Sequence, residues 1–192
     1  IWLMALGALT KPIGLLALPV AWLICLRQAD GQARVRLAVS GPLGALALAW
    51  LSFLPFGSPL GLVQRLASEA SAGAGFSPAA LTMLLIRWAD FPIRFATLAQ
   101  VAQVGFVLAA AWLCWRVWRR RLGVGKTADL FGLYLLTALN FRLWYTSWLF
   151  PWLLIEEDAP AWRLNAGYFF LVTTQLSVLI YAHLRIFALG GD

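Results

Sequence analysis

Residues 140–152 read NFRLWYTSWLFPW, and they set one arginine, Arg142, among aromatic rings inside a longer apolar segment. A charged side chain within an apolar span costs free energy unless it pairs with another group or faces a wet cavity, so such a residue points to function. We therefore ask which elements surround this stretch and which group pairs with Arg142.

The composition of the chain is that of an integral membrane protein. Of its 192 residues, 62% are hydrophobic and 12% are charged, and the mean hydropathy is +0.80. Soluble domains are about 45–50% apolar and about 25% charged. The apolar residues occur in runs of about 20, the length at which a helix crosses a bilayer. We therefore expect an all-α fold, a polytopic transmembrane helix bundle in which residues 1–192 form one domain.

The formal net charge is +7, which in a soluble protein would suggest nucleic acid as a partner. Here the arginines fall in short loops between apolar runs, where basic residues report topology. Residues 27–36 and 116–127 are such loops, and we expect both in the cytoplasm, with the protein in the inner membrane as a multi-pass chain. The second loop could also bind anionic lipid, but anchoring is the simpler explanation. Nucleic acid is not an expected partner, and membrane lipid is.

The hydropathy pattern predicts about five crossings, which lie at residues 1–26, 37–53, 95–118, 128–155 and 164–187. The fourth segment is too long for one straight crossing, so we expect a tilted or broken helix. On this interpretation the acidic residues at 156–160 lie on the outer face, and the last span returns to the cytoplasm. Two half-length crossings around Arg142 are the alternative, and they would reverse the last span.

Residues 57–94 are the longest connection and are predicted to form an external loop with short interfacial helices. Ser77 and Pro78 are typical of a helix start, since serine caps the first turn and proline fits its first position. The helix that follows, roughly residues 78–88, is apolar but too short to cross a bilayer. Long loops at a membrane face are often functional lids or binding elements.

The sequence carries no motif of a soluble enzyme and no metal-binding pattern. Cys25 and Cys114 lie in apolar runs without ligand spacing, so buried, inert thiols are expected. A divalent metal stays open but is not indicated, and no cofactor is expected. The chain starts at Ile1 without a charged region ahead of the apolar run, so it does not resemble a signal peptide. We expect it to be a piece of a longer protein.

Aromatic residues are concentrated beside Arg142. Trp144, Trp148 and Trp152 recur at steps of four and would share one face of a helix. Stacked rings near a guanidinium suit a sugar or a lipid-linked phosphate, because arginine grips phosphate with two nitrogens while rings cover the apolar faces of sugars. An aromatic belt with Arg142 extending toward the interface explains the same residues without a ligand.

Five features recur together in one known family. They are Lys11-Pro12 in a leucine-rich span, the span end Leu54-Pro55-Phe56, the helix start at residues 77–81, the arginine-rich loop, and residues 144–151, which are similar to a Pro-Trp-Tyr-x-x-Trp-x-x-Pro pattern. In these features the chain resembles the C-terminal half of a bacterial polytopic glycosyltransferase of the GT-C architecture. The resemblance is to the mannosyltransferase-like type that uses polyprenyl-phosphate sugars.

The resemblance implies an inverting transferase that moves a sugar from a polyprenyl-phosphate donor to an acceptor at the outer face. This chain would supply the donor-binding half, with Arg142 and Lys11 on the phosphate and with Trp144, Tyr145 and Trp148 around the sugar or lipid. The family's catalytic acid would lie upstream of Ile1.

If the chain is complete, Asp90 is the fallback base, although we expect it to pair with Arg87 or Arg94 instead.

Two other classes of function stay open. One is a non-enzymatic membrane subunit of a larger complex with partner chains, either structural or binding pigment or lipid. It would use His183 as a ligand and the tryptophans for packing. Near the inner end of the last span, His183 between a tyrosine and an arginine is better explained as an interfacial residue. A transporter is supported only by broken spans and charge within the membrane.

Overall fold

The computed structural model describes residues 12–58, 60, 61, 64, 68, 77–139, 145–156 and 159–183. These residues form helices, and no strand occurs among them, so the predicted all-α class is confirmed. The α-helices are α2 (Leu18–Gln28), α3 (Gly31–Phe53), α5 (Pro78–Trp88), α6 (Phe95–Arg120), α7 (Thr127–Thr137), α8 (Thr146–Leu154) and α9 (Ala161–His183). Short 3₁₀ turns are η1 (Pro12–Leu16), η2 (Leu54–Phe56) and η3 (Val124–Lys126).

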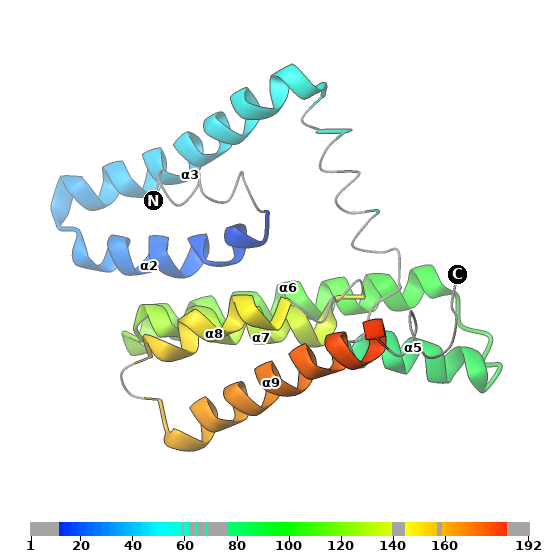
Figure 1. Ribbon diagram of the computed structural model, residues 1–192. Coiled ribbons are helices and arrows are strands. Elements are labelled where there is room, and N and C mark those ends of the chain that lie inside the picture. Colours follow the sequence, from blue (N-terminus) through cyan, green and yellow to red (C-terminus); the bar gives the residue numbers. More distant parts are fainter. Residues whose placement is uncertain are drawn as a thin grey trace.

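Helices α2 and α3 form an antiparallel hairpin with a very short connection (Figure 1). Ala29 and Asp30 alone join them, and Gly31 adopts a φ of 45° that favours glycine. The Trp22 indole nitrogen donates to the Leu37 carbonyl at 3.2 Å and ties the helices together. The expected loop at residues 27–36 is therefore wrong from Gly31 onward, because the alanine, arginine and glutamine there are good helix formers.

Helix α5 agrees with the sequence in its position and in its cap. It begins at Pro78, and the buried Ser77 side chain accepts a hydrogen bond from the Ala80 amide at 3.0 Å. Its inner face packs on α6 and α7 through a cluster of Met83, Ala99 and Leu139. The rest of the predicted external loop lies largely outside the described residues.

Helix α6 is the longest helix of the described chain, and it lies in the lower group of helices in Figure 1. Its 26 residues extend about 39 Å, and they confirm the helix predicted at residues 95–118, whose crossing of a membrane stays a prediction. Near its C-terminal end, Val117 packs with Val20 of α2 and Leu130 of α7. Two helices of the described chain, α3 and α6, are long and apolar enough to cross a bilayer. The five crossings expected from the sequence are not confirmed.

Helices α7 and α8 form a hairpin within residues 128–155, where the sequence predicts one tilted or broken helix. They are roughly 16 Å and 14 Å long, against the 30 Å of a bilayer core. The ring of Phe131 stacks on that of Trp152 with centroids 6.1 Å apart, so the two helices lie side by side. Two half-length helices, as in the alternative, are found, because Lys126 before α7 pairs with Glu156 after α8; that either helix crosses a bilayer stays a prediction.

The hairpin reverses the last helix relative to the preferred expectation. Glu156 contacts Lys126, so the end of α8 has returned to the end of the bundle where α7 began. The expected position of the acidic residues opposite the basic loop is therefore wrong for Glu156. Helix α9 starts at this same end and runs back along α8, to which it is joined by a buried hydroxyl pair, Thr146 Oγ1 and Thr174 Oγ1, 2.8 Å apart. His183 ends α9 at the opposite end, not at the inner end as expected.

Candidate functional site

The predicted donor-site residues divide between described and undescribed parts of the chain. Lys11, Arg142 and Trp144 lie outside the described residues, so their predicted roles stay predictions. Tyr145 and Trp148 are described at the start of α8.

The aromatic residues of α8 have different partners, and one of them, Phe150, meets Tyr168 of α9 edge to face. Tyr145 and Trp148 stack with ring centroids 4.1 Å apart and planes inclined by 18°. Trp152, one turn further on, instead stacks on Phe131 of α7. The row of tryptophans inferred from the sequence is thus not one continuous platform, because Trp152 takes part in the packing of the hairpin and Trp148 in the pair with Tyr145.

The residues that flank positions 140–144 lie toward the end of the bundle that carries α5. Leu139, two residues beyond the end of α7, is 2% exposed and packs against Met83 of α5 and Ala99 near the start of α6. One turn earlier in α7, Tyr134 meets Phe106 of α6 edge to face, with centroids 6.2 Å apart. Tyr134 and Leu139 therefore lie on the side of the bundle away from the basic loops.

An apolar cavity of about 860 Å³ lies among α5, α6, α7, α8 and α9. Its walls are almost entirely aliphatic and aromatic, and they include Leu81, Trp112, Gly132, Leu136, Leu149, Ala166 and Phe170. Asp129 and Arg163 line it at the end near the basic loop, and Ser77 of α5 also contributes. The volume is within the roughly 300–1,000 Å³ of pockets for small molecules, and the lining suits a hydrocarbon.

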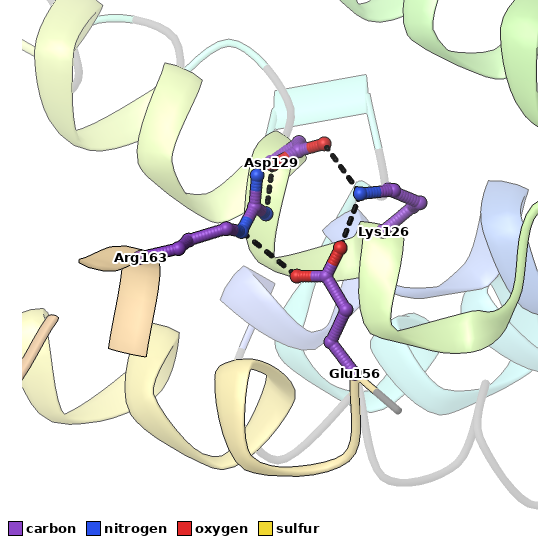
Figure 2. Close-up of polar contacts among 4 residues, drawn as sticks. All are labelled: Lys126, Asp129, Glu156 and Arg163. Carbon is purple, nitrogen blue, oxygen red and sulfur yellow. Dashed lines mark hydrogen bonds and ion pairs between the residues drawn. The ribbon is translucent and has the colours of Figure 1, made fainter. Parts of the chain in front are cut away.

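Four charged side chains close the hairpin at its base (Figure 2). Lys126 pairs with Glu156, and Arg163 pairs with Asp129. Arg163 Nε also lies 2.8 Å from Glu156 Oε2, an ion pair without hydrogen-bond geometry, and Lys126 Nζ lies 3.9 Å from Asp129 Oδ2. The Glu156 side chain is only 7% exposed. We call these four residues the charge cluster; its two cations balance its two anions, so it is a structural contact.

The charge cluster was not recognised in the sequence, although a signal for it existed. Lys126 and Asp129 precede the apolar segment of α7 and α8, and Glu156 and Arg163 follow it. Opposite charges on both flanks of an apolar segment can pair only if the segment doubles back. That pattern indicates a hairpin.

A glycine allows the base of the hairpin to close. A Cβ at Gly125 would lie 2.6 Å from the Cα and Cβ of Glu156, closer than real contacts allow, whereas a Cβ at Gly123 would meet nothing within 4 Å. We expect Gly125→Ala to destabilise the protein by about 1–3 kcal/mol through overpacking.

Gly123→Ala is the matched control for that substitution, and thermal unfolding in detergent measures both. Equal unfolding temperatures for the two variants would contradict the close approach of η3 to Glu156.

The remaining candidates have less support as a site. Asp90 is exposed with a φ of 55°, and in the described chain no ion pair joins it to Arg87 or Arg94, so the expected pairing is absent. His183 is the last helical residue of α9, and its side chain lies outside the description. Among the described residues, no group of three or more His, Cys, Asp or Glu side chains is arranged to hold a metal ion.

Comparison with models of known protein families, with curated proteins and with solved structures finds no match for this chain.

Proposed function

We propose that this chain is the donor-binding half of a membrane glycosyltransferase of the GT-C architecture. It would move a sugar from a polyprenyl-phosphate donor to an acceptor at the outer face of the membrane. The apolar cavity among α5–α9 is the observation that carries the proposal, because a polyprenyl chain is a long branched hydrocarbon and the cavity offers it an almost wholly apolar surface.

A multi-pass position in the inner membrane is part of the proposal. Large apolar side chains are exposed along both long helices, for example Leu43 and Leu46 of α3 and Val104 and Leu108 of α6. Apolar surface of this extent on a soluble monomer is rare. The basic residues gather where α2 and α3 join and where α6 ends, which favours that end as the cytoplasmic one.

The sugar phosphate would lie outside the cavity, near the turn between α7 and α8. The cavity offers few polar partners, and its Asp129 and Arg163 are already paired with each other. An unpaired phosphate buried there would be costly. Tyr145 and Trp148, whose rings stack on each other, follow Arg142 by three and six residues in sequence, and we place the sugar ring beside this pair.

The proposed reaction is a direct displacement. The acceptor hydroxyl gives its proton to a general base upstream of Ile1 and forms a bond to the sugar's anomeric carbon, while the bond from that carbon to the phosphate oxygen breaks. Arg142, with Lys11, would stabilise the charge that develops on the departing polyprenyl phosphate. Asp90 is the base only if nothing upstream supplies one.

Filling the cavity tests the proposal. A Cβ at Gly132 would meet nothing within 4 Å, and Gly132 lines the cavity, so Gly132→Trp should occupy the space without a backbone clash. We expect this variant of the full-length protein to lose about tenfold or more in transfer from radiolabelled polyprenyl-phosphate mannose, because the chain of the donor is excluded.

Gly105→Trp is the matched control. Gly105 is exposed on α6, a Cβ there also meets nothing, and it does not line the cavity. Transfer by Gly132→Trp equal to that of Gly105→Trp would contradict the proposal. Retention of a bound lipid by the wild type without any transfer would instead favour a non-enzymatic lipid-binding subunit.

A further inference from the structure

A second pocket, of about 420 Å³, lies at the basic end of the bundle and is lined by Arg27, Gln28, Arg34, Trp118 and Arg121. These residues come from the end of α2, the start of α3 and the end of α6, which meet on the left in Figure 1. We call it the arginine pocket. We infer that it binds the phosphate-bearing headgroup of an anionic phospholipid from the cytoplasmic leaflet, an inference that rests on the membrane position proposed above.

Two of the guanidinium groups are held in place by backbone carbonyls. Arg27 Nη1 donates to the Val117 carbonyl at 2.7 Å, which joins α2 to α6. Arg34 Nε donates to the carbonyls of Leu26 and Ala29 at 3.1 and 3.0 Å, where α2 ends. Each contact uses one nitrogen and leaves the others of that guanidinium available. A positioned guanidinium loses less conformational entropy when it grips a phosphate.

The arginines of the arginine pocket take no part in the ion pairs among the described residues. In the part of the chain that the structure describes, no carboxylate pairs with Arg27, Arg34 or Arg121. The charge cluster near it, by contrast, is neutral. Three like charges around one cavity repel one another, and an anion between them removes that repulsion.

Arg121 adds a backbone observation. It ends α6 in the left-handed region with a φ of 52°, where non-glycine residues are uncommon. A glycine at position 121 would adopt this conformation without strain. Placing arginine at this position keeps its guanidinium in the pocket lining, at a cost of about 1 kcal/mol in backbone conformation.

The position of the pocket favours a lipid over a free anion. It lies at the ends of α3 and α6, the two described helices able to cross a bilayer, so a headgroup in it would place its acyl chains along their exposed apolar faces. Trp118 in the lining is a residue typical of the headgroup region. Basic pockets between helices on the cytoplasmic side are known binding places for anionic headgroups.

The test measures phosphatidylglycerol binding to the purified full-length protein in detergent by native mass spectrometry, with phosphatidylcholine as the neutral comparison. We expect the wild type to retain phosphatidylglycerol preferentially and Arg34→Gln/Arg121→Gln to lose that preference by about tenfold. The control is Arg119→Gln/Arg120→Gln, which removes the same charge from the same end. Arg119 lies over the Trp115 ring, and neither residue lines the pocket.

Several outcomes would overturn the inference. Equal losses in the two double variants would show that general positive charge holds the lipid. Displacement of phosphatidylglycerol by millimolar inorganic phosphate would point to a small-anion site, and pocket-dependent binding of a single-stranded oligonucleotide would point to nucleic acid. Thermal unfolding of both variants checks that they fold. Because Gly132→Trp should keep phosphatidylglycerol, failure here is distinguishable from failure of the proposed transferase function.

Discussion

Full-length protein carrying Arg142→Ala is expected to lose glycosyl transfer from polyprenyl-phosphate mannose by about 100-fold or more, mainly in kcat. The proposed role of Arg142 is to stabilise charge that develops on the phosphate as the sugar leaves, and removing one such group costs about 10²–10³ in rate. An interaction made mainly in the transition state lowers kcat, whereas one made equally in the ground state raises KM. Steady-state transfer in membranes separates the two.

Two further variants make the Arg142 experiment specific. Arg142→Lys should recover part of the rate, because it keeps the charge but loses the two-nitrogen grip. Arg94→Ala removes an exposed arginine just before α6 and should stay close to wild type. Membrane insertion is checked by the yield of folded protein. Transfer by a well-inserted Arg142→Ala within twofold of wild type would refute the role of Arg142.

Replacing Glu156 with alanine is expected to destabilise the protein by about 3 kcal/mol. The carboxylate is 7% exposed and contacts both Lys126 and Arg163, so among the described residues its removal leaves Asp129 alone to pair with the two cations. Thermal unfolding in detergent measures the loss as a lower unfolding temperature.

A double-mutant cycle shows whether the effect comes from the charge cluster. Lys126→Met together with Glu156→Met should be less destabilising than the sum of its single variants, because no unpaired charge remains. Asp30→Ala removes an exposed acid outside the cluster and should change little. If Glu156→Ala were as stable as Asp30→Ala, the base of the hairpin would not be closed as described.

Local signals in the sequence predicted individual helices well. Ser77 and Pro78 define the start of α5 through a cap and a proline position that depend only on neighbouring residues. The length of α6 follows from a long, largely apolar run that ends in arginines. Such signals are short in range, so one sequence is enough to recognise them.

These local signals could not predict the direction in which α8 and α9 run relative to α7. One tilted span and a hairpin of two short helices use the same 28 apolar residues, so hydropathy does not separate them. The contacts that decide between them join residues 30 and 34 positions apart, Lys126 with Glu156 and Asp129 with Arg163. The sequence shows that both flanks of the apolar segment carry one acid and one base, but it does not show which of these side chains pair.

In the candidate site, too, features that depend on neighbouring residues were predictable, whereas features built from several helices were not. The stacked pair of Tyr145 and Trp148 follows from close neighbours on one helix. The apolar cavity and the arginine pocket each draw residues from three or more helices, and in both cases the individual residues resemble ordinary lining or anchoring residues. Only the packing of α5–α9 reveals that small residues such as Gly132 and Ala166 leave a space between helices.

Photo-crosslinking with a polyprenyl phosphate that carries a diazirine within its hydrocarbon chain tests the central claim most directly. In membranes containing the full-length protein, label is predicted in peptides of α7 and α9 that line the cavity. It should be lost in Gly132→Trp and kept in Gly105→Trp. Label spread over the exposed faces of α3 and α6, and unchanged by Gly132→Trp, would contradict the assignment of the cavity to the lipid donor.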